Sequence, residues 1–249
     1  MTATPAWPPK SAPRLFVATP LAQGADLNLD GNPAHYLLRV MRAQPGSIVI
    51  LCDNLTGEWA AEVVSTGKRD VVLRIGQRLR IREDVPDFTL CAALLKKDRF
   101  DWVLEKATEL GVRRIQPVLT RRCVADRLNL DRARALIAEA AEQCARTALP
   151  DLAEPLKLDS LLRGWPQDRT LFFADEQGGP PARQAFVAHP GPAALLVGPE
   201  GGFDDAERAS IRALGQSMPL SLGPRILRGE TASIAGICLW MASQGDWTN

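Results

Sequence analysis

A glycine-rich loop follows an apolar run at residues 193–203, which read AALLVGPEGGF. Five consecutive apolar residues predict a buried strand, and the spacing of Asp204 and Glu207 after the loop is that of a helix capping box. In open α/β sheets, ligands bind beyond the carboxyl ends of strands, where glycines let the backbone approach them closely. The stretch therefore predicts a strand, a ligand-binding loop and a helix. It lacks the G-x-G-x-x-G pattern and the Walker A lysine, which disfavours a dinucleotide or phosphate cradle.

A second loop, residues 222–232 with the sequence LGPRILRGETA, also lies between an apolar strand and a helix. Helix capping by Thr231 and attraction of Glu230 to the positive end of the helix would explain these two residues. Exposure to water does not explain Arg225 and Arg228, because almost any polar residue would be accepted at an exposed position. Helix capping and solvation therefore leave Arg225 and Arg228 unexplained.

Apolar strands and helices alternate through the chain from Asp87 onward. This order predicts a parallel sheet covered by helices on both faces. Asp98 is expected to cap one of these helices, and Trp102, beside Phe100 and Val103, is expected in the core. The main elements are expected at residues 88–95, 98–110, 115–119, 131–148, 171–174, 194–197, 204–214, 218–222 and 231–243.

Short strands dominate the first 82 residues instead. They are expected at 14–18, 47–53, 58–65 and 70–82, with turn signals between the later ones. One helix is expected after the first strand, with Asp30 as its N-cap and Pro33 in its first turn. The pattern predicts a small β-barrel or curled sheet as a first domain over residues 1–82, followed by a second domain over residues 83–249.

The 249-residue chain has the composition of an ordinary globular protein, with 46% hydrophobic and 24% charged residues. This excludes a disordered or collagen-like chain. Residues 1–82 carry ten Lys or Arg against six Asp or Glu, a net charge of +4, whereas residues 83–249 carry twenty against twenty-three, a net charge of −3. A basic front half is thus joined to a mildly acidic back half.

The five cysteines and two histidines form neither a disulfide framework nor a metal-ligand spacing. We therefore expect reduced thiols and no metal. No segment approaches about 18 consecutive apolar residues, and residues 1–13 hold four prolines without the apolar centre of a secretory signal. These features predict a cytoplasmic protein without a membrane partner.

The two loops together resemble the signature of the RsmE family of ribosomal RNA methyltransferases, in the SPOUT superfamily. The resemblance runs from about residue 14 to residue 243. Three positions depart from the family pattern: Gly229 where threonine is usual, Cys144 where serine is usual and Ala133 where an aromatic residue is common. The further matching segments are Arg14-Leu15-Phe16, His35, residues 38–42, residues 105–112 and residues 139–146.

The resemblance implies a fold and an activity. The fold is α/β: a small PUA-like β-barrel domain precedes a parallel-sheet methyltransferase domain of the SPOUT type, tied in a trefoil knot. The implied protein is a homodimer that binds S-adenosylmethionine between loops 174–178, 198–202 and 222–227. It transfers a methyl group to N3 of a uridine in small-subunit (16S) ribosomal RNA, either naked or within the assembled small ribosomal subunit.

Particular residues carry these expectations. An adenosine ring needs an apolar slot with backbone donors and acceptors at its edge. Arg228 is the candidate for stabilising negative charge on O4 or O2 of the uracil. Glu230 or Glu200 is the candidate for taking the N3 proton, and the sequence does not choose between them. The expected cofactor-binding residues are Leu196, Gly198, Glu200, Gly201, Gly202, Leu222, Gly223, Ile226 and Leu227.

RNA binding requires positive charge and flat stacking groups. The expected RNA-binding residues are Arg14, His35, Arg39 and Arg42. A second basic face is expected on the strand over residues 70–82, where arginines alternate. Two alternatives remain open: a non-catalytic RNA-binding adaptor, supported by Gly229, and a knotted methyltransferase that acts on tRNA or on a ribose 2′-hydroxyl.

Overall fold

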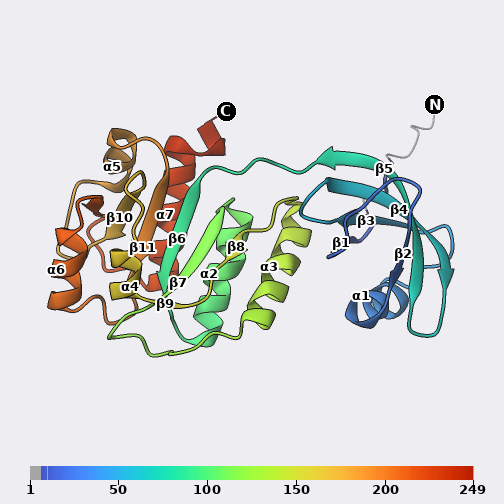
Figure 1. The fold of residues 1–249 in the computed structure, drawn as a ribbon, viewed down its shortest axis with the longest axis horizontal. Coiled ribbons are helices and arrows are strands. Elements are labelled where there is room, and N and C mark those ends of the chain that lie inside the picture. The colour runs from blue at the N-terminus through green and yellow to red at the C-terminus, as the bar shows by residue number, and fades with distance from the viewer. Residues whose placement is uncertain (1–6, 10, 249) are drawn as a thin grey trace. The chain divides into compact units, whose positions relative to one another are not determined.

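The computed structural model describes residues 7–9 and 11–248, and within it the chain forms two compact units (Figure 1). The first unit comprises the chain up to Asp84 together with Ala141–Ala148. The second comprises Val85–Ala140 and the chain from Leu149 onward. The first unit is therefore assembled from two segments that lie far apart in the sequence.

The first unit is built on a five-stranded sheet with the order β1-β3-β4-β5-β2. Strand β1 runs parallel to β3 and the other neighbours are antiparallel. A short helix, α1 (Gly31–His35), continues as the π-helical turn η1 (Tyr36–Val40). The strands are β1 (Arg14–Phe16), β2 (Asp26–Leu29), β3 (Ile48–Cys52), β4 (Gly57–Thr66) and β5 (Val71–Ile81).

Apolar side chains from η1 and the strands fill the core of this unit, among them Leu37, Leu51 and Leu73. The sequence predicted the sheet and its helix but not β2. That strand has four residues, of which only Leu29 is buried, so its alternation is too short to stand out. Asp30 is the N-cap of α1, but its side chain makes no capping hydrogen bond.

The second unit contains a parallel sheet with the order β12-β10-β11-β6-β7-β8, as the alternation of strands and helices predicted. A further short strand, β9, pairs with β7. The strands are β6 (Phe88–Ala93), β7 (Arg114–Leu119), β8 (Asp151–Leu152), β9 (Leu156–Lys157), β10 (Thr170–Ala174), β11 (Ala193–Val197) and β12 (Ser217–Leu220). The helices are α2 (Lys97–Glu109), α3 (Leu130–Cys144), α4 (Leu158–Arg163), α5 (Ala182–Ala188), α6 (Asp205–Ala213) and α7 (Gly229–Gln244), with a final 3-10 turn η2 (Asp246–Thr248).

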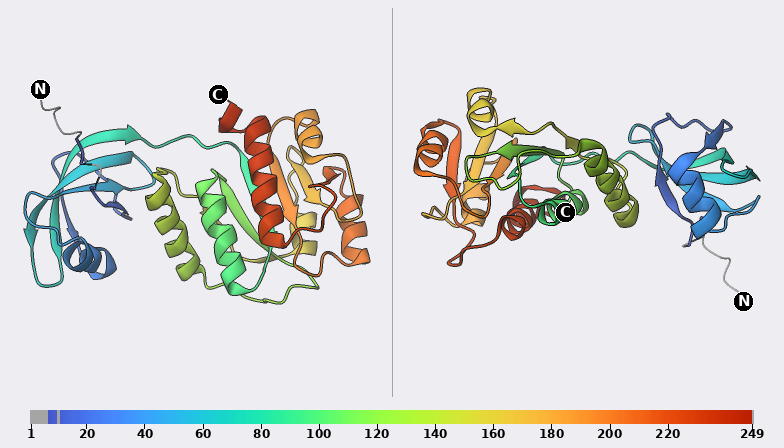
Figure 2. Two further views of the ribbon diagram at one scale, coloured as in Figure 1. Left: turned by 180° about the vertical axis from the view of Figure 1, so that it is seen from behind. Right: turned by 90° about the horizontal axis from the view of Figure 1, so that it is seen from below.

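Helices cover both faces of this sheet (Figure 2). Successive strand residues point to opposite faces, so Leu195 packs in a core with α2, α5 and α7, whereas Leu196 packs in a second core with α4 and α6. Among the helices of the described residues, none combines the length and apolar character needed to cross a bilayer.

Three local expectations in this unit meet different outcomes. The capping box of Asp204 and Glu207 is confirmed at the start of α6. The expected caps of α2 and α7 are wrong: α2 begins at Lys97, and α7 begins at Gly229, so Asp98 and Thr231 lie inside the first turns. Trp102 is also not in the core, because its side chain lies on the exposed face of α2 with 56% of its surface accessible.

Candidate functional site

One cavity of about 320 Å³ lies beyond the carboxyl ends of β10, β11 and β12. These strands are parallel and adjacent, so the loops that follow them meet at one edge of the sheet. Loops 174–178, 198–203 and 221–228 all contribute to its lining, and α7 closes it with Gly229 and Ala232. This is the edge at which open parallel sheets bind their ligands.

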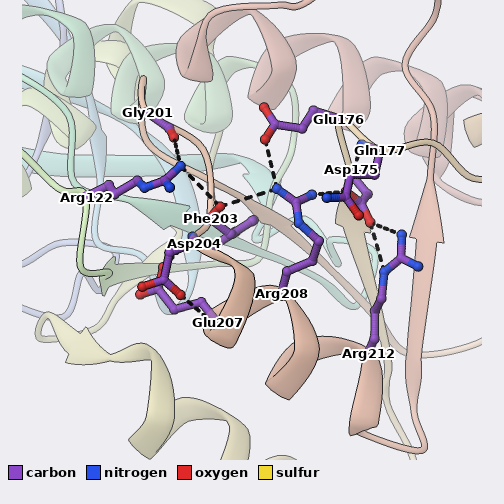
Figure 3. A network of polar contacts seen from close by, with 10 residues as sticks. All are labelled: Arg122, Asp175, Glu176, Gln177, Gly201, Phe203, Asp204, Glu207, Arg208 and Arg212. Atoms are coloured by element: carbon purple, nitrogen blue, oxygen red, sulfur yellow. Dashed lines mark hydrogen bonds and ion pairs between the residues drawn. The ribbon is translucent and has the colours of Figure 1, made fainter.

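Loop 198–203 is fixed by hydrogen bonds from several directions (Figure 3). Within the loop, the Gly202 N–H donates to the Pro199 carbonyl over 2.9 Å. From outside, Arg122 Nη1 donates to the Gly201 carbonyl over 2.7 Å. The Phe203 ring packs against Gly198, where an added Cβ would lie only 3.2 Å from the ring. The backbone of this loop is thus set by the protein itself.

A buried ionic network supports the same end of the cavity (Figure 3). Asp175, just after β10, has a fully buried side chain, and Arg208 and Arg212 of α6 both donate to its carboxylate. Burial raises the pKa of Asp175, but hydrogen bonds from Arg212 and the Gln177 N–H, with the nearby guanidinium charges, outweigh it and lower the pKa overall. The sequence analysis missed this network, although the polar run 175–177 directly after a strand was a usable signal.

Loop 221–228 is open by contrast. Its internal hydrogen bonds join Ser221 Oγ to the Gly223 N–H over 3.2 Å and to the Gly223 carbonyl over 3.5 Å. Ile226 is 89% exposed although its side chain is large and apolar. Within the described chain, the Arg225 and Arg228 side chains form no hydrogen bond or ion pair. Leu222 and Leu227 are partly buried against the core, and Ser221 forms backbone hydrogen bonds with Pro180 and Ala182, so the loop is anchored at its two ends and open between them.

Most of the expected cofactor-binding residues line the cavity together, but Leu196 and Gly201 do not. Leu196 points into the core shared with α4 and α6, away from the cavity. Gly201 faces Arg122, whose side chain would lie 3.4 Å from a Cβ at this position. The expected residues that do line the cavity are Gly198, Glu200, Gly202, Leu222, Gly223, Ile226 and Leu227.

The expected catalytic residues flank Gly229 at the start of α7. Arg228 is the N-cap residue and is exposed. Glu230 is 9% exposed, and its Oε2 is buried without a hydrogen-bond partner among the described residues. Arg99 lies between the two candidate proton acceptors: its Nη1 is 3.2 Å from Glu200 Oε1 and its Nε is 3.8 Å from Glu230 Oε1. The sequence analysis did not single out Arg99 as a residue of this site.

Gly229, where the resemblance to the RsmE family leads us to expect threonine, is closely packed. An added Cβ would lie 3.0 Å from Leu95 Cδ2 and 3.1 Å from the Gly198 carbonyl oxygen. Such spacing is tighter than ordinary van der Waals contact, so any side chain here would displace a neighbour. The departure from the family pattern therefore coincides with a close approach of α7 to loop 198–203.

The expected RNA-binding residues lie in the first unit and differ in their surroundings. Arg14 Nε donates to Glu58 over 2.7 Å, and Arg80 Nε donates to the other oxygen of Glu58 over 2.6 Å. Burial raises the pKa of Glu58, but the hydrogen bonds from Arg80 and Arg14 outweigh it and lower the pKa overall. Arg74 pairs with Asp26, so the expected basic face of β5 is partly neutralised by carboxylates.

His35 and Arg39 remain close together on the surface. They line a concavity of about 460 Å³ with Lys68 and Arg69, two basic residues that the sequence analysis did not single out. Arg42 is exposed and has a left-handed backbone conformation at φ 52°. Four basic side chains without an ion pair among the described residues, His35, Arg39, Lys68 and Arg69, thus gather near α1 and the turn between β4 and β5.

No group of three or more His, Cys, Asp or Glu side chains among residues 7–9 and 11–248 is arranged to hold a metal ion.

Two family models match the chain: an RNA methyltransferase domain over residues 82–241 and an RNA methyltransferase PUA domain over residues 29–76. The second match assigns the PUA-like fold to the first unit.

Relatives with names and structures agree with these matches. The ribosomal RNA small subunit methyltransferase E of Synechocystis is 32% identical over 88% of this chain and 74% of its own, and that of Rickettsia conorii is 27% identical over 90% and 93%. A putative methyltransferase of Legionella pneumophila, solved with the cofactor SAM, has a TM-score of 0.86 at 30% identity, covering 94% of this chain and 99% of its own. The Neisseria gonorrhoeae ribosomal RNA small subunit methyltransferase E, solved with S-adenosyl methionine, has a TM-score of 0.85 at 28% identity, covering 95% and 99%. This chain therefore belongs to the ribosomal RNA small subunit methyltransferase E family of RNA methyltransferases.

Proposed function

We propose that this protein is a cytoplasmic enzyme that methylates N3 of a uridine in small-subunit (16S) ribosomal RNA with S-adenosylmethionine as the methyl donor. The observation that carries the proposal is a cavity lined by all three loops beyond β10, β11 and β12, with Arg228 and Glu230 on either side of its lining residue Gly229. Family membership supports the small-subunit RNA substrate, and the two solved relatives that hold the cofactor support its use here.

The cavity residues fit this cofactor. A volume of about 320 Å³ reaches the lower end of the range of small-molecule sites, roughly 300–1,000 Å³. Leu222, Ile226 and Leu227 supply apolar surface for an adenine ring, and the glycines of loop 198–203 leave backbone groups accessible. Arg208, which lines the cavity, has a buried Nε–H without a partner among the described residues, so an acceptor on a ligand would satisfy it.

The chemistry of the chain follows from charge and position. The sulfonium of the bound cofactor supplies an electrophilic methyl group. The protein must hold the uracil N3 in line with it and remove the N3 proton. Glu230, with one carboxylate oxygen free of partners, would take that proton, and Arg228 would stabilise the negative charge that spreads onto O4 or O2. Arg99 would hold Glu230 and Glu200 in position between the two loops.

A homodimer and a trefoil-knotted SPOUT path are part of the same proposal. The exposed aromatic residues Trp102 on α2 and Trp247 on η2 lie on elements that both contact α7, and Leu239 on α7 is partly exposed too. Apolar surface of this kind is typical of an interface. Light scattering of the purified protein at micromolar concentration should give twice the chain mass of 27.1 kDa.

The proposal is tested by methylating purified small ribosomal subunits and, separately, their naked RNA and bulk tRNA, followed by mass spectrometry of the nucleosides. We expect N3-methyluridine in the small-subunit RNA. Methylation of tRNA alone, methylation of a ribose 2′-hydroxyl, or cofactor binding without transfer to any of the three substrates would overturn it. The last outcome would favour the adaptor alternative.

RNA binding by the first unit is proposed to use His35, Arg39 and Arg42, with Lys68 and Arg69 beside them, whereas Arg14 is held by Glu58. Replacing Arg39 and Arg42 together by Gln should weaken RNA binding and reduce its salt dependence. Each lost phosphate contact lowers the slope by about 0.7–0.9. Arg74→Gln, which breaks an exposed pair with Asp26, is the matched control. An unchanged slope in the double variant would show that these arginines do not touch phosphates.

A further inference from the structure

The carboxylate of Glu176 lies at the edge of the cavity, on the loop that follows β10. Its side chain is 46% exposed, and its Oε1 accepts a hydrogen bond from Arg208 Nη2 over 2.8 Å (Figure 3). Both carboxylate oxygens lie 3.0 Å from the place that a Cβ on Gly202 would occupy. Glycine at position 202 thus leaves the space in which this carboxylate sits.

Arg208 of α6 holds the Glu176 carboxylate in this position. Its guanidinium, 7% exposed, donates to Asp175 and Glu176 of one loop and to the Phe203 carbonyl of the other, the last over 3.3 Å. A planar guanidinium fixes several acceptors in one geometry, which a lysine ammonium does not. Arg212 contacts only Asp175 in this network, and no hydrogen bond in the described chain takes it to Glu176 or to loop 198–203.

Glu176 Oε2 receives no hydrogen bond from the described residues. The cavity lining therefore includes a carboxyl oxygen of Glu176 that is free to accept, while the other oxygen is held by a buried guanidinium. A nucleoside cofactor carries matching donors: two ribose hydroxyls, an adenine amino group and, in S-adenosylmethionine, an α-ammonium. Acidic side chains are used in this way on ribose hydroxyls in other nucleotide sites.

We propose that Glu176 binds the cofactor directly, as an acceptor for its hydroxyl or ammonium donors, and that Arg208 is the positioning residue that aims it. The inference rests on the proposed function and adds two residues to it. A hydrogen bond to a charged group contributes about 1.5–3 kcal/mol, and tenfold in affinity corresponds to about 1.4 kcal/mol. Loss of this contact should therefore weaken binding by roughly 10- to 100-fold.

The test is calorimetric binding of S-adenosylmethionine and of its demethylated product, S-adenosylhomocysteine, to the full chain. Glu176→Gln and Arg208→Met should each weaken binding of both nucleosides, and the double variant should bind no more weakly than Arg208→Met alone. Arg208→Lys keeps the positive charge but loses the planar set of guanidinium donors. Its cofactor affinity should therefore lie between those of Arg208→Met and wild type. With saturating cofactor, kcat of Glu176→Gln should stay close to wild type while the KM for the cofactor rises.

Melting temperatures and a matched arginine variant separate this role from simple support of the fold. Arg212→Met breaks its own pair with Asp175 but leaves Glu176 and Phe203 in contact with Arg208, so it should lower the melting temperature and change affinity by less than about threefold. Folded Glu176→Gln protein that binds like wild type would overturn the inference alone. So would equal weakening by Arg212→Met and Arg208→Met. A wild-type chain that binds neither nucleoside would overturn the proposed function as well.

Discussion

Loops 198–203 and 221–228 line the same cavity and differ in how they are held. The first is fixed by Arg122, Arg208 and the capped start of α6, whereas the second is exposed at Ile226 and leaves Arg225 and Arg228 without partners in the described chain. Loop 198–203 is therefore the fixed wall of the site, because contacts within the protein set its backbone. Loop 221–228 is the open wall, which presents its side chains to the ligands. Substitutions that disturb the fixed wall should therefore lower the free energy of unfolding. Substitutions in the open wall should mainly lower the methylation rate or the cofactor affinity.

The largest effect is expected at the support of the fixed wall. Asp175→Asn removes the charge that two arginines share, one of them buried, and should lower the free energy of unfolding by about 3–5 kcal/mol. Denaturant unfolding of the wild type and the variant measures this. If the variant keeps wild-type stability, the network does not hold the fixed wall.

The same carboxylate makes a pH prediction. The pKa of folded Asp175 lies below its ordinary value of 3.8, so its contribution is complete above that value and is lost as the pH falls through the lower folded value. Wild-type stability should drop more steeply below pH 3.8 than that of Asp175→Asn. Glu58→Gln, in the first unit, is a useful comparison because the pKa of Glu58 is also lowered. If the stabilities of wild type and Asp175→Asn fall equally steeply as the pH is lowered, the prediction is contradicted.

Next is Arg228 in the open wall. If it stabilises charge that appears only in the transition state, Arg228→Ala should lower the single-turnover rate by roughly 10²–10³, with cofactor affinity and melting temperature unchanged. A folded variant that methylates within about threefold of wild type would exclude a catalytic role, since a transition-state contact costs far more. Activity that falls only in proportion to folded protein would mean that Arg228 supports structure.

A smaller effect is expected at Gly202 of the fixed wall. Its φ of 66° and the Glu176 carboxylate beside it both oppose a side chain, so Gly202→Ala should cost about 1–3 kcal/mol of stability and weaken cofactor binding. Gly215→Ala, where φ is ordinary and no atom lies within 4 Å of the added Cβ, is the matched control. Equal melting temperatures for the two variants would mean that loop 198–203 adjusts its backbone to accept a side chain at position 202 without loss of stability.

The smallest effect on stability is expected at Ile226. Because its side chain is already in water, Ile226→Ser should change the free energy of unfolding by less than about 0.5 kcal/mol. It should nonetheless weaken cofactor binding about three- to tenfold if the side chain is covered by the bound adenine. Ile81→Ser, at an exposed position of the first unit, should change neither quantity. An Ile226 variant with normal affinity would remove this residue from the proposed site.

Both glycine-rich loops were predictable from the sequence because each signal is local: an apolar strand, then glycines, then a helix start. The same signals predicted the parallel sheet. The network beneath them was not predictable, because Asp175 and Arg208 are 33 residues apart and meet only when β10 and α6 are placed. Leu196 shows a related limit. In a run of five buried residues the sequence does not tell which alternate set packs in the core with α7 and which packs in the core with α4 and α6.

The end of helix α3 has a consequence for synthesis of the chain. Glu142 Oε1 accepts from the Phe16 N–H over 2.8 Å, and the Ala145 carbonyl accepts from Arg80 over 2.7 Å, so the first unit includes residues that follow Asp84 by as many as 64 positions. Domains made of one continuous segment can close as soon as they leave the ribosome. This one cannot, because its last segment is translated about 3–13 s later at about 5–20 residues per second. The PUA-like unit therefore completes its fold only after the first strands and helices of the methyltransferase unit have been made.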